Sequence, residues 1–147
     1  MADAGKAITA AVIGKITAAS ASFRWLGFEV EHAEPGFTRI ALTVRPEMLN
    51  AHGTLHGGLV FMLADTAFGY AAQAYNQQAV SASAEIEFLA PALLGERLIA
   101  EAREVWKKGR NMITDVRITN PAGETVALVR GRMRFVGGPH VDAEAAP

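Results

Sequence analysis

A glycine-rich segment that runs into an apolar stretch holds the residue types best suited to chemistry. Residues 50–58 read NAHGTLHGG, and the apolar stretch that follows holds one carboxylate, Asp65. If a helix begins at Gly57 or Gly58, its first N–H groups have no acceptor within the helix and carry partial positive charge. Glycine lets a ligand approach these groups closely, because it has no Cβ. An amide donor and an acid that is costly to bury are groups that acyl-transfer chemistry uses.

Histidine and asparagine in the same segment are further candidates. His56 is expected to cap the helix or orient the turn, and a role as general base ranks behind Asp65. Asn50 is typical of a turn. His52 and His56 have the i, i+4 spacing of some metal ligands, but they lie in a glycine-rich turn without a third ligand. We therefore expect no metal and no cofactor. The chain has no cysteine, which excludes disulfides, thiolate nucleophiles and Cys-type zinc sites.

Composition narrows the class of protein. The 147 residues predict a single domain over 1–147, with a core over about 23–136 and a flexible tail over 137–147. The net charge of -1 and pI near 6.4 argue against a nucleic-acid partner. The most hydrophobic stretch, residues 59–75, holds polar residues and falls short of the roughly 18 apolar residues of a membrane span. We expect a cytoplasmic protein with no membrane partner.

Periodicity predicts an α+β fold. Helical spacing covers residues 5–19, and a hairpin of alternating strands covers 28–34 and 37–45. A long helix from Gly58 is apolar on almost all sides, which indicates burial. Four more strands are expected over 83–88, 96–107, 112–119 and 127–135. An antiparallel sheet of about six strands would curl around the long helix.

One line along the long helix departs from its apolar character. Asp65, Gly69, Gln73 and Asn76 form a stripe of small or polar residues. Edge strands and this stripe would be exposed in a monomer. We therefore expect self-association through a sheet edge or along the helix.

The sequence resembles a known family, the hotdog-fold acyl-CoA thioesterases of the phenylacetate-pathway (PaaI) type. The resemblance spans roughly residues 23–136 and includes the order of elements. Weaker matches are the segments 88–91 and 109–110, with Asn120 and Gly123. The matching positions that carry it are Asn50, Gly53, His56-Gly57-Gly58 and Leu63-Ala64-Asp65-Thr66-Ala67.

The resemblance implies a role for each site residue. Asp65 would be the catalytic acid, either a general base for water or a nucleophile. The Gly57 N–H would polarise the thioester carbonyl, His56 would orient the turn or the thioester, and Asn50 would position the water. Family members are usually tetramers, built as dimers of dimers with sites at the dimer interface.

Helix geometry limits how these groups can meet. Gly57 and Asp65 are eight residues apart on one helix, which separates them by roughly 12 Å along its axis. An acid must come within about 3 Å of the reacting atom or of one bridging water. Two antiparallel helices related by a two-fold axis would solve this, each lending its Asp65 to the Gly57 turn of the other.

The preferred hypothesis is hydrolysis of an aromatic (phenylacetyl- or hydroxyphenylacetyl-type) or short-chain acyl-CoA. The alternatives are a hotdog hydratase or dehydratase that acts on an acyl thioester, and a non-catalytic module that binds acyl-CoA or an acyl carrier protein. Ser81 and Ser83 are weaker candidates for contact with the acyl group. Some basic residues near the strand ends are expected to meet the phosphates of coenzyme A.

Overall fold

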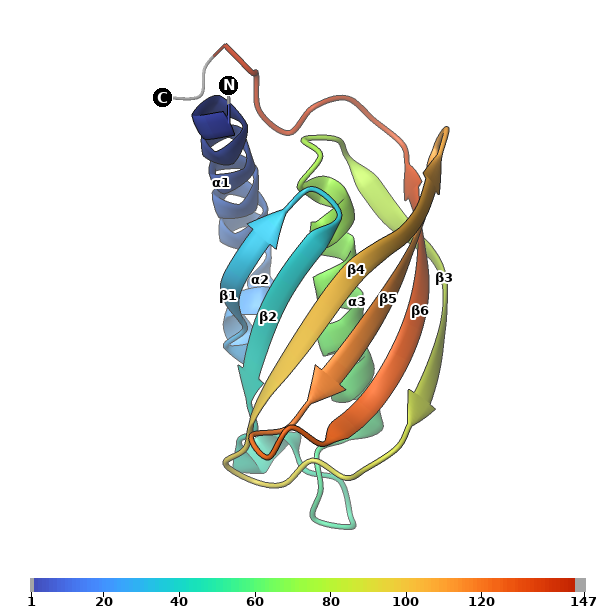
Figure 1. Cartoon of the computed structure of the whole chain (residues 1–147). Helices are drawn as coiled ribbons and strands as arrows, with labels where there is room; N and C mark the ends of the chain where they lie inside the picture. Colours follow the sequence, from blue (N-terminus) through green and yellow to red (C-terminus); the bar gives the residue numbers. More distant parts are fainter. Residues whose placement is uncertain (1, 145–147) are drawn as a thin grey trace.

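A curved six-stranded antiparallel sheet wraps around one central helix (Figure 1). The computed structural model describes residues 2–144. Its elements, in chain order, are α1 (Ala2–Ala19), α2 (Ala21–Leu26), β1 (Glu29–Glu34), β2 (Phe37–Thr43), a 3-10 turn (Pro46–Met48), α3 (Gly57–Gln73), β3 (Ala79–Phe88), β4 (Arg97–Lys108), β5 (Asn111–Thr119) and β6 (Thr125–Phe135). This arrangement confirms the predicted hotdog fold with a helix at the N-terminus. Helix α1 covers the helix predicted over residues 5–19, and the short α2 that follows was not predicted.

Helix α3 is buried because the sheet curls over it. Its apolar side chains pack against inward-facing side chains of the strands, and Leu63, Ala67 and Phe68 have no exposed surface. The strands lie in the order β1-β2-β4-β5-β6-β3, and every neighbouring pair is antiparallel. Strands β1 and β3 therefore form the two edges of the sheet.

The edge strand β3 is long and exposed. It has ten residues, and within the described residues it pairs with β6 on one side only. Its pairing with β6 shifts between Ser81 and Ser83, and such a bulge changes which face a side chain points to. An edge of this length is a template for pairing with another strand.

The expected polar stripe on α3 is only partly present. Asp65 and Gln73 are half-buried, but Gly69 is buried inside the protomer. Asn76 lies beyond the end of the helix, in a left-handed turn with φ 56°. The prediction of one continuous exposed stripe was therefore wrong, because the helix ends before Asn76 and the fold buries Gly69.

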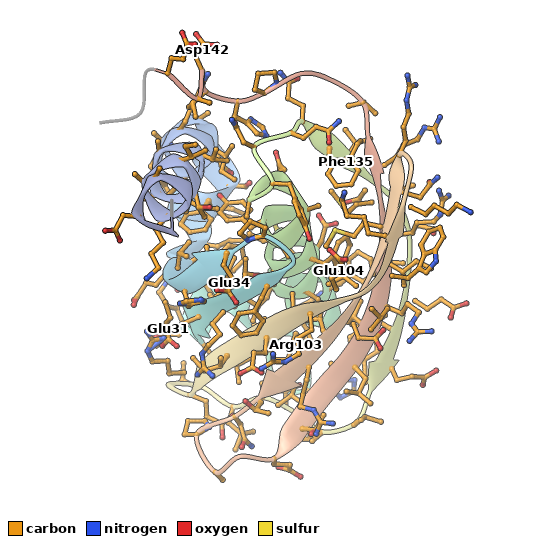
Figure 2. The ribbon with its side chains drawn as sticks, turned by 45° about the horizontal axis from the view of Figure 1, so that its top comes forward. Glu31, Glu34, Arg103, Glu104, Phe135 and Asp142 are labelled. Carbon is orange, nitrogen blue, oxygen red and sulfur yellow. The ribbon has the colours of Figure 1, made fainter. Side chains whose placement is uncertain are left out.

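The C-terminal end of α3 is anchored to the sheet through Tyr75. Its hydroxyl donates to Glu104 Oε2 at 2.8 Å, and its ring meets the Phe135 ring edge-on. Burial and this carboxylate raise the pKa of Tyr75 to about 12. Figure 2 labels Glu104 on β4 and Phe135 on β6. Arg103, the residue before Glu104, instead places its guanidinium over the Phe37 ring.

The segment after β6 is also held to this end of α3. Asn76 Oδ1 accepts from the N–H groups of His140 and Val141, and its amide donates to the Val141 carbonyl. Lys15 of α1 donates to the His140 carbonyl. Part of the expected flexible tail thus hydrogen-bonds to the domain, whereas residues 145–147 of that tail lie outside the described residues.

We predict that His140 makes stability depend on pH. Burial lowers the pKa of His140 below its ordinary value of 6.5; a bond to the Gln77 backbone opposes the shift, and the Lys15 charge adds to it. As pH falls below 6.5, the unfolded chain takes up this proton before the folded chain does, so stability is lost. The fall in melting temperature between about pH 7.5 and about pH 5 should be smaller in His140→Gln. His32→Gln, at a half-exposed histidine, is the control; an equal effect there would contradict the prediction.

Candidate active site

A tight loop precedes α3, and Asn50 builds it. The Asn50 side-chain oxygen accepts from the N–H groups of His52 at 2.9 Å and Thr54 at 3.3 Å. Its side-chain amide donates to Thr54 Oγ1, and its backbone N–H donates to the Thr54 carbonyl. These bonds give Asn50 a structural task in the loop. The role in positioning water stays a prediction.

His56 caps the first turn of α3. Its Nδ1 accepts from the Gly58 N–H at 2.9 Å, and its backbone N–H donates to the Met48 carbonyl. Because Nδ1 is an acceptor here, the neutral ring carries its proton on Nε2. His56 therefore caps the turn, and this bond leaves its Nε2–H unused. This arrangement favours the capping role over that of a general base.

The Gly57 amide is the unsatisfied donor of this turn. The N–H of Gly58 bonds to the His56 ring, and those of Leu59 and Val60 donate to the His56 carbonyl. Among residues 2–144, no group accepts from the Gly57 N–H. An unpaired N–H at a helix N-terminus carries partial positive charge and attracts an oxygen with excess negative charge.

The Gly57 amide borders a pocket of about 370 Å³. Its walls come from the loop, from the first turn of α3 and from the segment after β3. The Phe88 ring lies against Gly57, since a Cβ there would be 3.2 Å from two ring carbons. Most of the lining residues are apolar, but polar atoms form nearly half of the pocket surface: Asn50, Thr54, Leu55, Gly57, Val60, Phe88, Leu89, Ala90, Pro91 and Ala92.

Asp65 lies two turns along α3, where it meets β3 rather than the Gly57 turn. Ser81 Oγ donates to Asp65 Oδ1 at 2.6 Å, and lies 3.5 Å from Met133 Sδ. The sequence had suggested Ser81 as a contact for the acyl group, but the structure places it on the carboxylate. Ser81 thus holds one oxygen of Asp65 and leaves the other available.

One protomer does not bring the predicted residues together. Asn50, His56 and Gly57 lie in or beside the first turn of α3, and Figure 1 shows this end of the helix at the bottom. Asp65 is eight residues further along the helix, roughly 12 Å away by the rise per residue.

Across the described residues, no three His, Asp or Glu side chains cluster as metal ligands do. None of the described helices is long and apolar enough to span a bilayer.

A family model described as the thioesterase superfamily matches residues 52–127, which include the loop after Asn50, α3 and the strands β3, β4 and β5. The chain belongs to the thioesterase superfamily. Acyl-coenzyme A thioesterase PaaI of Escherichia coli K12 is 38% identical to this thioesterase over 113 residues, covering 77% of this chain and 81% of that one. The solved structure of E. coli PaaI superimposes with a TM-score of 0.87 at 34% identity, over 89% of this chain and 95% of that chain. The chain is therefore a PaaI-type hotdog thioesterase, a thioester hydrolase.

Two other relatives of this thioesterase extend the comparison. Human acyl-coenzyme A thioesterase 13 is 36% identical over 123 residues, covering 81% of this chain and 79% of that one. A Streptococcus mutans UA159 protein solved bound to acetyl CoA has a TM-score of 0.74 at 28% identity, over 76% of this chain and 90% of that chain.

We predict that Ser81→Ala lowers the kcat of the thioesterase about ten- to a hundredfold, because Asp65 loses a hydrogen bond that orients it, and a hydrogen bond to a charged group is typically worth about 1.5–3 kcal/mol. Ser81 is exposed, so the melting temperature should stay close to that of the wild type. Ser81→Thr keeps the hydroxyl and should recover most of the rate. Equal rate losses in the alanine and threonine variants would show that the bond to Asp65 does not matter.

Proposed function

We propose that this thioesterase hydrolyses an acyl-CoA whose acyl group is aromatic, of the phenylacetyl or hydroxyphenylacetyl type, or short. The observation that carries this proposal is the unpaired N–H of Gly57, a residue that lines a pocket beside Phe88 and Leu89. It offers one donor to a carbonyl oxygen beside apolar space for an acyl group. The relatives support it, because two are named acyl-CoA thioesterases and one was solved with acetyl CoA.

The proposed reaction uses a backbone donor and one carboxylate. The thioester oxygen accepts from the Gly57 N–H, and the negative charge that develops on it during attack strengthens this bond. Asp65 takes a proton from water while the water oxygen bonds to the carbonyl carbon. The C–S bond then breaks, the thiolate of CoA leaves and takes up a proton, and the free acid is released. Direct attack by Asp65, followed by hydrolysis of the anhydride, gives the same products.

His56 and Asn50 complete the proposed site in supporting roles. His56 fixes the turn through its bond to the Gly58 N–H, and it directs its Nε2–H to the thioester. Asn50 holds the loop through its bonds to residues 52 and 54, and an N–H of its side chain would hold the attacking water. No cofactor enters this scheme.

We propose that the site is shared between two copies, and contacts along β3 support this. Gly57 touches Phe88 near one end of the strand, whereas Asp65 touches Ser81 near the other. If two β3 strands pair antiparallel about a two-fold axis near the strand centre, the Phe88 end of one subunit lies beside the Ser81 end of its partner. The Gly57 turn of each subunit then faces the Asp65 of the other, in two equivalent sites.

The proposal also covers the oligomeric state, the cellular location and the pathway of this thioesterase. Two such dimers would form the homotetramer that the family resemblance implies. A cytoplasmic location suits a substrate whose carrier bears several phosphate charges, because charged groups are costly to move into a membrane. A place in phenylacetate catabolism follows if the acyl group is of the phenylacetyl type.

Thiol release from a panel of acyl-CoAs tests the proposed activity. We expect the wild type to release CoA from phenylacetyl-CoA, and Asp65→Asn to be slower by about 10²- to 10⁴-fold, the usual contribution of a general base. Asp115→Asn is the matched control, because Asp115 pairs with Arg130 away from the Gly57 pocket, and it should keep near wild-type activity. No thiol release by the wild type from any member of the panel would refute hydrolysis.

Mixed dimers test the shared site. Asp65→Asn and Gly57→Leu should each be almost inactive alone, because each damages both sites of a dimer. When the two are co-expressed equally, half of the dimers are mixed and each has one intact site, so about a quarter of the wild-type activity should return. A mixture of Asp65→Asn with Asp65→Ala should recover nothing. Inactive mixed dimers, purified through two different tags, would contradict a shared site.

A further inference from the structure

Phe88 is an exposed aromatic residue at the C-terminal end of β3, the end that lies against Gly57. Its exposed fraction is 57%, and that of Leu89 is 55%. Phe88 pairs with Ala127 at the last position of the β3–β6 ladder, so the sheet does not cover its ring. The ring contacts Gly57 closely enough that a side chain at position 57 would have to displace it. Within the protomer, Phe88 therefore adds little to the buried core.

The Phe88 ring also lines the pocket beside Gly57, where it can contact a bound acyl group. If a substrate carbonyl accepts from the Gly57 N–H, it lies beside a residue that lines the pocket, and the attached acyl group can extend along the pocket walls. The apolar side chains in those walls include Leu55, Val60, Phe88 and Leu89. Apolar groups that enter such a pocket remove this exposed surface from water. The pocket volume of about 370 Å³ lies within the range of small-molecule sites.

We infer that Phe88 is a specificity-determining residue that selects an aromatic acyl group through ring-to-ring contact. The inference rests on the proposed function and deepens it. Aromatic rings prefer offset-stacked or edge-to-face arrangements, and the gain beyond area burial corresponds to a factor of about two to twelve. A straight acyl chain gains from burial in the same pocket but lacks this directional contribution. Phe88 therefore favours phenylacetyl-type groups over aliphatic ones of equal carbon number.

The test compares kcat/KM for phenylacetyl-CoA and octanoyl-CoA, which have equal numbers of acyl carbons. In Phe88→Leu the ratio of the two values should fall by about two- to twelvefold, whereas Phe88→Tyr, which keeps the ring, should preserve it. Trp106→Leu is the control, because Trp106 is exposed to 46% but does not line the Gly57 pocket. Melting temperatures verify that each variant is folded. An unchanged ratio in Phe88→Leu would overturn the inference while leaving the thioesterase activity in place.

A binding measurement separates failure of this inference from failure of the proposed function. In the slow Asp65→Asn protein, calorimetry gives Kd values for the same two acyl-CoAs, with and without Phe88→Leu. The preference for phenylacetyl-CoA should fall by the same factor as in the kinetics. If the wild type releases no thiol but this preference falls as expected, only the proposed hydrolysis is refuted. A preference that Phe88→Leu does not alter, or no binding of either ligand, overturns the inference.

Discussion

The distance between Gly57 and Asp65 along one helix is the constraint on which the rest of the site depends. Only the first N–H groups of a helix are free to hold a substrate oxygen, so the donor must lie at the start of α3. A carboxylate in that same turn would attract those N–H groups itself. An acid placed eight residues further on leaves the donor free, and in the proposed reaction it serves the Gly57 turn of another copy. The exposed edge of β3 offers that copy a place to pair.

Such a site needs α3 to be fixed firmly against the sheet. Tyr75 and Asn76 tie its C-terminal end to β4 and to the segment after β6. In the middle, β6 approaches so closely that a Cβ at Gly131 would lie 2.7 Å from the Phe68 ring. Because β6 pairs with β3, this contact also fixes α3 relative to the edge strand. The position of Asp65 relative to β3 is thus set by packing rather than by loops.

The helices and strands could be predicted well from the sequence, because the spacing of apolar residues shows which side of each element is buried. The alternation in residues 37–45 and 127–135 predicted strands, and the apolar run after Gly57 predicted a helix with a sheet around it. The contact between Ser81 and Asp65 could not be predicted, because a bulge between Ser81 and Ser83 breaks the two-residue period from which faces are assigned. The bonds of Asn76 to residues 140 and 141 were missed because they join distant segments through a left-handed turn.

The groups that act on the thioester in the proposed reaction differ from the side chains that contact the acyl group, so the pocket determines substrate selectivity. In the proposed reaction, the Gly57 N–H and the Asp65 carboxylate contact only the carbonyl and the water, which are common to every acyl thioester. Neither group can therefore distinguish one acyl group from another, since specificity requires a difference in interaction energy between substrates. Discrimination must come from side chains that line the space beyond the carbonyl. At the end of β3, the Phe88 ring is one of these side chains, and it also lies against the glycine whose amide holds the oxygen.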